Sequence, residues 1–212
     1  MKTYAFIFAR GGSKGVTGKN TRLLGGIPLL AHSIKLAQQI SQIEEVFVST
    51  EDKSITEVAQ NWGAKVIPRP AELAQDTSPE WLAWQHAVEW VIQEKGEFDV
   101  FVSLPATSPL RNRDDVENCL NKFDEDSEMI VTSTGTNRSP WFNMVKVGEN
   151  GHASLLLEGE NKYIRRQDVP QAYDMTTVAY VTRPTFIREA SAIFDGRTKV
   201  VEIPEERALD ID

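Results

Sequence analysis

The chain has 212 residues, 41% of them hydrophobic, and a formal net charge of −8 at pH 7. A chain of this length can bury a large core, and its negative charge argues against nucleic acid or an anionic membrane as the main partner. Cys119 is the only cysteine, so no intrachain disulfide can form, and the first apolar run is too short for a signal peptide or membrane span. We therefore expect a soluble, cytoplasmic protein.

Strands and helices are predicted to alternate through the first 133 residues. Short apolar runs are typical of buried strands, and apolar residues at helical spacing indicate the helices between them. The predicted strands cover residues 4–9, 46–48, 66–67, 98–102 and 129–132. Helices are expected after Pro28, after the capping residue Asp52 and after Pro79, with a fourth around residues 116–123. This alternation indicates an α/β fold with a mostly parallel sheet flanked by helices.

The pattern becomes β-rich after Pro140. Residues 144–147 and 153–157 flank a glycine-containing turn and predict a hairpin, and residues 178–181 and 200–203 predict two further strands. The sequence shows no clear linker. We therefore interpret residues 1–212 as a single domain that carries a β-rich excursion.

The loop after the first predicted strand, residues 10–20, combines four glycines with Arg10, Lys14 and Lys19. Glycines expose backbone N–H groups to a ligand, and ligands of open α/β sheets bind at the carboxyl ends of strands. The loop fits neither a P-loop nor a dinucleotide-binding fingerprint, because Ser13 occupies the first glycine position of a P-loop and Asn20 follows Lys19. A triphosphate-binding loop and a solvated basic turn are both compatible with this composition.

Six stretches resemble the acylneuraminate cytidylyltransferase family, the CMP-sialic acid synthetases. They are, in chain order, ARGGSKGVTGKN (9–20), VSTED (48–52), RPAELAQDTS (69–78), TSPLR (107–111), RQDVPQAY (166–173) and LDID (209–212). Residues 140–143 and 173–175 are similar to the branch that acts on legionaminic acid.

The resemblance implies a Rossmann-like nucleotidyltransferase fold that transfers CMP from CTP to the anomeric hydroxyl of a nine-carbon 2-keto-3-deoxy sugar acid and releases pyrophosphate. It also implies dependence on Mg²⁺. It further implies a homodimer in which approximately residues 138–172 form a dimerisation excursion that crosses to the partner. Neither nucleic acid nor membrane is an expected partner.

The matched motifs imply roles for individual residues. The implied catalytic residues are Arg10, Lys19 and Asp210, and the implied metal ligands are Asp210 and Asp212. The implied nucleotide-binding residues are Arg10, Gly11, Gly12, Ser13, Lys19, Asn20, Arg69 and Ser78. Asp210 and Asp212 lie two residues apart, so on an extended segment they point the same way, as a shared Mg²⁺ would require. Composition alone favours two solvated acids in a frayed terminus, and only the resemblance reverses that interpretation.

The implied sugar-binding residues are Thr107, Arg166, Gln167 and Tyr173. Arg166 is expected to pair with the sugar carboxylate, and a surface ion pair is an equal alternative for its neighbour Arg165. The chain departs from the family pattern on the expected sugar side at Leu104–Ala106, where a glutamine is common, at Thr176–Thr177, where Asn-Gly is frequent, and at Phe142. In the glycine-rich loop, Thr17 replaces a common proline.

Two alternative functions remain open at this point. One is a cytidylyltransferase for the eight-carbon acid Kdo, although the 69–73 and 107–111 stretches favour the nine-carbon branch. The other is a catalytically silent domain that senses nucleotides, against which the presence of Lys19, Asp210 and Asp212 argues.

Overall fold

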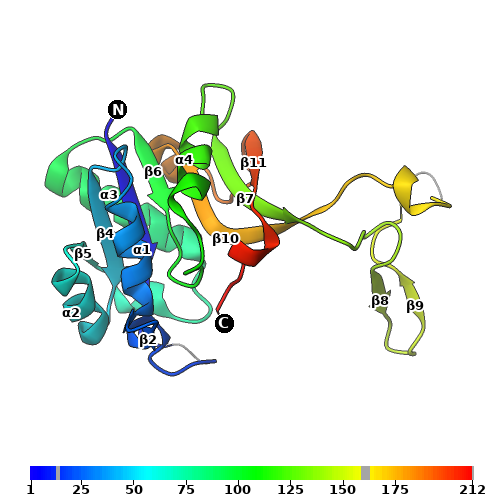
Figure 1. Ribbon diagram of the computed structural model, residues 1–212, viewed down its shortest axis with the longest axis horizontal. Helices are drawn as coiled ribbons and strands as arrows, with labels where there is room; N and C mark the ends of the chain where they lie inside the picture. Colours follow the sequence, from blue (N-terminus) through cyan, green and yellow to red (C-terminus); the bar gives the residue numbers. More distant parts are fainter. Residues whose placement is uncertain (13–14, 159–162, 212) are drawn as a thin grey trace.

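A seven-stranded sheet forms the centre of the protein in the computed structural model, which describes residues 1–12, 15–158 and 163–211 (Figure 1). The strand order is β11-β7-β10-β6-β1-β4-β5. The strands are β1 (Thr3–Phe8), β4 (Glu45–Thr50), β5 (Lys65–Pro68), β6 (Val100–Ser103), β7 (Met129–Gly135), β10 (Tyr173–Thr182) and β11 (Thr198–Glu202). Every pairing is parallel except those of β10, which runs antiparallel to both β6 and β7. The predicted mostly parallel α/β fold is confirmed.

Helices cover both faces of this sheet. They are α1 (Leu29–Ala37), α2 (Lys53–Asn61), α3 (Glu80–Lys95), α4 (Arg113–Lys122) and α5 (Pro184–Glu189). Helices α1, α2 and α4 pack their apolar side chains into one core cluster, and α3 and α5 pack into the other. Strand β1 serves both clusters because its side chains alternate, with Ala5 and Ile7 on one face and Tyr4 and Phe6 on the other.

Local sequence signals account for several of these boundaries. The predicted cap Asp52 accepts a hydrogen bond from the Ile55 N–H at 3.0 Å and begins α2. Asn112 and Asp115 form a reciprocal capping box at the start of α4. Helix α5 was not predicted, because its six residues are too few to show helical periodicity.

An arm, of which the structure describes residues 136–158 and 163–172, leaves β7, extends far from the sheet and returns into β10 (Figure 1). It contains the predicted hairpin as β8 (Val145–Val147) and β9 (Ala153–Leu155), with every residue of both strands exposed. Large apolar side chains on the arm face solvent in this single chain: Val145, Val147, Leu155, Leu156, Leu157 and Ile164. A two-stranded hairpin with an exposed apolar surface is marginal alone.

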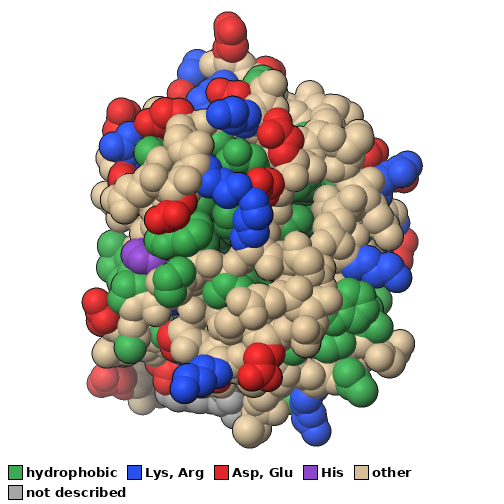
Figure 2. Space-filling view, turned by 90° about the vertical axis from the view of Figure 1, so that its left-hand side faces the viewer, with side chains coloured by type: hydrophobic (Ala, Val, Ile, Leu, Met, Phe, Trp, Pro, Cys, Tyr) green, Lys and Arg blue, Asp and Glu red, His purple; other side chains and the backbone are tan. Residues whose placement is uncertain are grey.

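The end of the molecule opposite the arm carries acidic and basic side chains in an interspersed pattern (Figure 2). None of the described helices has both the length and the apolar character that crossing a membrane requires.

A bulge interrupts β10, where the pairing with β7 shifts between Thr176 and Tyr180. The buried Thr132 hydroxyl satisfies the polar groups that this bulge leaves unpaired. It accepts from the Ala179 N–H at 3.2 Å and from the Thr176 hydroxyl at 2.8 Å. It also lies 3.3 Å from the carbonyls of Thr176 and Ala179, to one of which it donates. Thr177 lies within this bulge, between the Thr176 and Ala179 groups that Thr132 contacts.

We predict that Thr132→Val lowers the free energy of unfolding by about 1–3 kcal/mol, because it leaves the buried Ala179 N–H without an acceptor while preserving side-chain volume. Urea denaturation measures this loss. Thr134→Val is the matched control on the same strand, since no hydrogen bond of the Thr134 side chain is found among the described residues. Equal stability of the two variants would contradict the role of Thr132.

Candidate active site

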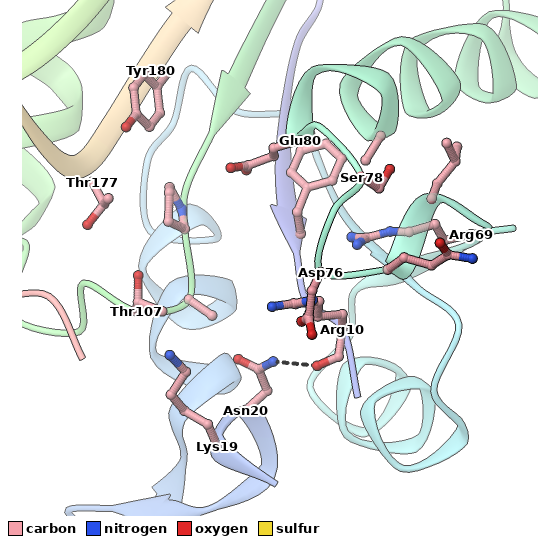
Figure 3. Close-up of a pocket in the computed structure, with 16 residues that line it drawn as sticks. Arg10, Lys19, Asn20, Arg69, Asp76, Ser78, Glu80, Thr107, Thr177 and Tyr180 are labelled. Atoms are coloured by element: carbon pink, nitrogen blue, oxygen red, sulfur yellow. Dashed lines mark hydrogen bonds and ion pairs between the residues drawn. The ribbon is translucent and has the colours of Figure 1, made fainter. Parts of the chain in front are cut away.

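A pocket of about 370 Å³ opens near the carboxyl ends of β1 and β6 (Figure 3). This is where open α/β sheets place their ligands. Six residues singled out from the sequence line it: Arg10, Lys19, Asn20, Arg69, Ser78 and Thr107. The structure therefore brings together predicted residues that are up to 97 positions apart in the chain, since they run from Arg10 to Thr107.

The glycine-rich loop supplies the basic side of the pocket. Arg10 forms an ion pair with Asp76, and the buried Asn20 side chain donates to the Arg10 carbonyl at 3.1 Å. The Lys19 amine donates to the carbonyl of Ile211 at 2.7 Å. Two cations are thus oriented toward one cavity, an arrangement suited to a polyphosphate.

Gly11 and Gly12 of the same loop differ in how closely they are packed. The Gly11 N–H donates to the Glu51 carboxylate at 2.8 Å, and a Cβ at Gly11 would lie 2.4 Å from Oδ2 of Asp52. Nothing lies within 4 Å of a Cβ built at Gly12. Gly11 therefore lets the loop approach the capping residue of α2. Ser13, the third predicted residue of this run, lies outside the described residues.

Arg69 also lines the pocket, and hydrogen bonds to Ser49 hold its side chain in place. Its Nε and Nη2 donate to the hydroxyl and carbonyl of Ser49 at 3.1 and 2.6 Å, and its guanidinium lies 5.6 Å from the ring centre of Phe8. Burial lowers the pKa of the guanidinium below its ordinary value, while the Glu51 and Glu80 carboxylates act in the opposite direction. These contacts fix the orientation of the charged plane at the pocket wall.

Glu80 is a pocket residue that the sequence analysis missed. Its carboxylate points into the pocket and accepts from the Trp84 indole N–H at 3.2 Å (Figure 3). The surrounding walls partly desolvate this carboxyl, which raises its pKa. The position directly after Pro79 looked like an ordinary acidic residue in the first turn of a helix, so the sequence carried no separate signal.

Arg111, the last residue of the TSPLR stretch, is buried beneath the pocket. Its Nε donates to the Ser108 carbonyl at 2.9 Å, and its Nη2 donates to the Pro105 carbonyl and, at 3.2 Å, to the Ser33 hydroxyl. Burial lowers its pKa to about 9, which leaves it charged at pH 7. The motif thus has a structural basis, because its arginine holds the loop that carries Thr107.

The C-terminal segment is anchored beside this loop. Arg207 makes a bidentate ion pair with the buried carboxylate of Asp115, with Nε and Nη2 each 3.0 Å from a carboxylate oxygen. Further on, the Ile211 N–H donates to the Thr107 carbonyl at 2.9 Å, and the Thr177 hydroxyl donates to the Asp210 carboxylate at 2.9 Å. Residues 207–211 are therefore docked rather than frayed, and Asp210 lies beside the pocket.

The chemistry of this edge is compatible with Mg²⁺. Thr177 engages one oxygen of Asp210, and Mg²⁺ is commonly held by one or two carboxylates together with substrate phosphates and waters. Asp212, the second predicted ligand, lies outside the described residues. Among the residues that are described, no three acidic, histidine or cysteine side chains form a metal-binding group.

Three of the four predicted sugar-binding residues lie away from the pocket of their own chain. Thr107 lines the pocket, whereas Arg166 and Gln167 lie on the arm and Tyr173 lies at the start of β10. Arg166 donates to the Asn137 carbonyl at 2.9 Å, and Arg165 forms an ion pair with Asp168 at 2.9 Å. The surface ion pair considered for Arg165 is therefore present.

The chain matches one protein family and is similar to several known proteins. Residues 4–206 match the model of the cytidylyltransferase family. The chain is 32% identical to a CMP-N,N'-diacetyllegionaminic acid synthase of Campylobacter jejuni, over 97% of this chain and 88% of that protein. It is 30% identical to a pseudaminic acid cytidylyltransferase of the same species, over 100% of this chain and 91% of the other. A CMP:2-keto-3-deoxy-manno-octonic acid synthetase complexed with CTP has a similar fold, with a TM-score of 0.69, 19% identity, and coverage of 96% and 90% of the two chains.

We predict that Gly11→Ala lowers the free energy of unfolding by about 1–2 kcal/mol, because the added Cβ displaces the Asp52 side chain that caps α2. Gly12→Ala is the matched control, since its Cβ enters open space. Thermal denaturation of both variants measures the difference, and a Gly11→Ala variant as stable as Gly12→Ala would refute the contact.

Proposed function

The chain belongs to the cytidylyltransferase family, and from that premise we propose that it transfers CMP from CTP to the anomeric hydroxyl of a nine-carbon 2-keto-3-deoxy sugar acid. The observation that carries this proposal is the contact of Lys19 with the C-terminal segment, which brings the basic loop and Asp210 to one pocket. In the reaction, the anomeric oxygen forms a bond to the α-phosphorus of CTP. The bond from that phosphorus to the bridging oxygen breaks, pyrophosphate leaves with the electron pair, and the proton of the anomeric hydroxyl passes to solvent.

Positioning and charge stabilisation dominate such a transfer. We assign Lys19 and Arg10 to the triphosphate, where their charges offset the negative charge that accumulates on the departing pyrophosphate. Asp76 holds the Arg10 guanidinium at the pocket before CTP arrives. The backbone N–H groups of the loop supply further donors, with Gly11 and Gly12 allowing the approach.

Mg²⁺ would neutralise the phosphate charge and orient the α-phosphate when bound. Asp210 is our proposed ligand, because its carboxylate lies beside the pocket and opposite the basic loop. We retain Asp212 as the second ligand on the basis of the sequence motif. Asp210 belongs to a docked segment, so substrate and ion are expected to bind together.

Recognition of cytosine is assigned to Arg69 and Ser78, which lie on the wall of the pocket away from Thr177 (Figure 3). Arg69 is already fixed by Ser49, so little conformational entropy is lost when it meets the base. A site that hydrogen-bonds one pyrimidine edge discriminates against the other, because its polar groups would be left unpaired.

The sugar is proposed to bind near Thr107, where Tyr180 and Thr177 complete the pocket. The exposed apolar surface of the arm supports a homodimer in which each arm packs on the partner. In that assembly Arg166 and Gln167, which lie far from their own pocket, reach the sugar bound by the other chain, and Tyr173 lies at the root of the arm. Arg166 would pair with the sugar carboxylate.

We predict that the purified protein releases pyrophosphate with CTP, Mg²⁺ and a legionaminate- or neuraminate-type acid, and that UTP, ATP and GTP are poor donors. Coupled pyrophosphate detection with a panel containing N-acetylneuraminate, legionaminate and Kdo measures this preference. Turnover with Kdo alone would identify an eight-carbon specificity. Absence of turnover with every acid, despite tight CTP binding, would support a nucleotide sensor and overturn the proposal.

We predict that Lys19→Ala and Arg166→Ala each lower kcat/KM by about 10²–10³-fold, because each removes a charge that faces a substrate anion. If the arms cross, mixing the two variants under conditions that exchange subunits restores activity. One site of each mixed dimer then has both intact residues, so about a quarter of wild-type activity should return. Failure of mixing to restore activity would show that Arg166 does not act across subunits.

A further inference from the structure

Two hydroxyl groups connect the loop above Arg111 to the Asp210 carboxylate. The Ser108 and Thr177 hydroxyl oxygens lie 2.7 Å apart, and the Thr177 hydroxyl oxygen lies 2.9 Å from Oδ1 of Asp210. An ionised carboxylate only accepts hydrogen bonds, so Thr177 must use its single proton toward Asp210. Ser108 must then donate to Thr177. The direction of both hydrogen bonds is therefore determined by the carboxylate.

The backbone positions both hydroxyls independently of Asp210. Ser108 is fully buried, and its carbonyl accepts from the Arg111 guanidinium at 2.9 Å. Thr177 lies in the β10 bulge, whose neighbouring polar groups are paired with Thr132. Bulges commonly redirect a side chain next to a functional site. Here the redirected side chain meets the C-terminal segment, which follows the edge strand β11.

The contact with Asp210 depends on the side chain at position 177. Where the resembled family frequently has Asn-Gly, this chain has Thr176–Thr177. A glycine at position 177 could offer no hydroxyl to Asp210. In this chain the Thr177 side chain contacts the acid from a position that also lines the pocket.

We propose that Thr177 is a positioning residue for the reaction, and that its hydroxyl, oriented by Ser108, fixes the Asp210 carboxylate at the mouth of the pocket. This inference rests on the proposed function in one respect, since Asp210 is there assigned to Mg²⁺. Groups that orient a metal-binding side chain typically change metal affinity by about 10–100-fold when removed. Thr177 acts through Asp210, whereas Lys19 and Arg10 act on the substrate directly.

The test compares Thr177→Val, Thr177→Ser and Ser108→Ala with the wild type. Thr177→Val preserves volume and removes the hydroxyl, and Thr177→Ser restores the hydroxyl. Ser108→Ala removes the donor to Thr177 from a residue that is buried and does not line the pocket, so it cannot act by losing a substrate contact. The measurements are the affinity of Mn²⁺ for the CTP complex, amide hydrogen exchange at Ile211, and KM for the sugar acid.

We expect Thr177→Val to lower the affinity for Mn²⁺ by about 10-fold and Ser108→Ala to lower it as well. The Mn²⁺ affinity of Thr177→Ser should stay close to that of the wild type. Exchange at the Ile211 amide, which donates to Thr107, should accelerate in Thr177→Val. In Ser108→Ala the KM for the sugar should be unchanged. Wild-type Mn²⁺ affinity and wild-type exchange in both hydroxyl-deleted variants would overturn the proposal.

A separate result identifies failure of the proposed function. If the wild type neither binds Mn²⁺ with CTP nor releases pyrophosphate, the assignment of Asp210 to a metal is wrong. Amide hydrogen exchange at Ile211 then tests whether the Thr177 hydroxyl positions the C-terminal segment. Faster exchange in Thr177→Val but not in Thr177→Ser supports the positioning of the segment by the hydroxyl, and equal exchange in the two variants refutes it.

Discussion

The buried guanidinium of Arg111 is the interaction on which the pocket depends. A buried charge is costly unless it is compensated. Here two carbonyls and one hydroxyl accept hydrogen bonds from Nε and Nη2, and the nearby carboxylates of Asp115 and Asp210 offset the charge, while Nη1 is buried with no hydrogen-bond partner among the described residues. By donating to the carbonyls of Pro105 and Ser108, the Arg111 guanidinium fixes the backbone between these two residues. That short loop then supplies the Thr107 carbonyl to Ile211 and the Ser108 hydroxyl to Thr177, so the position of the C-terminal acid follows from a cation that never meets the ligand.

The two sides of the pocket come from opposite ends of the chain. Lys19 and the carbonyl of Ile211 are 192 residues apart in sequence and form a direct hydrogen bond. The N-terminal side is a loop shaped by glycine, and the C-terminal side is a segment held by Arg207 and Asp115. Neither side has a hydrophobic core of its own at this edge. Their relative placement therefore depends on polar contacts with the sheet between them, which is why single hydroxyls such as those of Thr132 and Thr177 matter here.

Much of this architecture could be predicted from local patterns, and the exceptions have physical causes. Apolar runs located β1, β4 and β6, and capping chemistry located the start of α2. The full length of β10 could not be predicted, because Tyr173–Met175 are exposed and carry no strand-like alternation. In the site, motifs identified Arg10, Lys19 and Arg69. The pairing of Arg10 with Asp76, the exposure of Glu80 to the pocket and the burial of Arg111 arise from tertiary packing, and a single basic or acidic residue in a sequence does not reveal its partner.

The antiparallel insertion of β10 has a consequence for how the chain folds as it is synthesised. Strands β1, β4, β5 and β6 occupy adjacent positions and can pair as soon as the first half of the chain has emerged. Strand β7 cannot join them, because its place in the sheet is separated from β6 by a strand that follows the whole arm. The edge of β6 therefore stays open for about 70 further residues, and closure of long-range strand pairs is intrinsically slow. During that interval the nascent chain exposes the unpaired backbone edge of a strand whose four side chains are all buried in the finished fold.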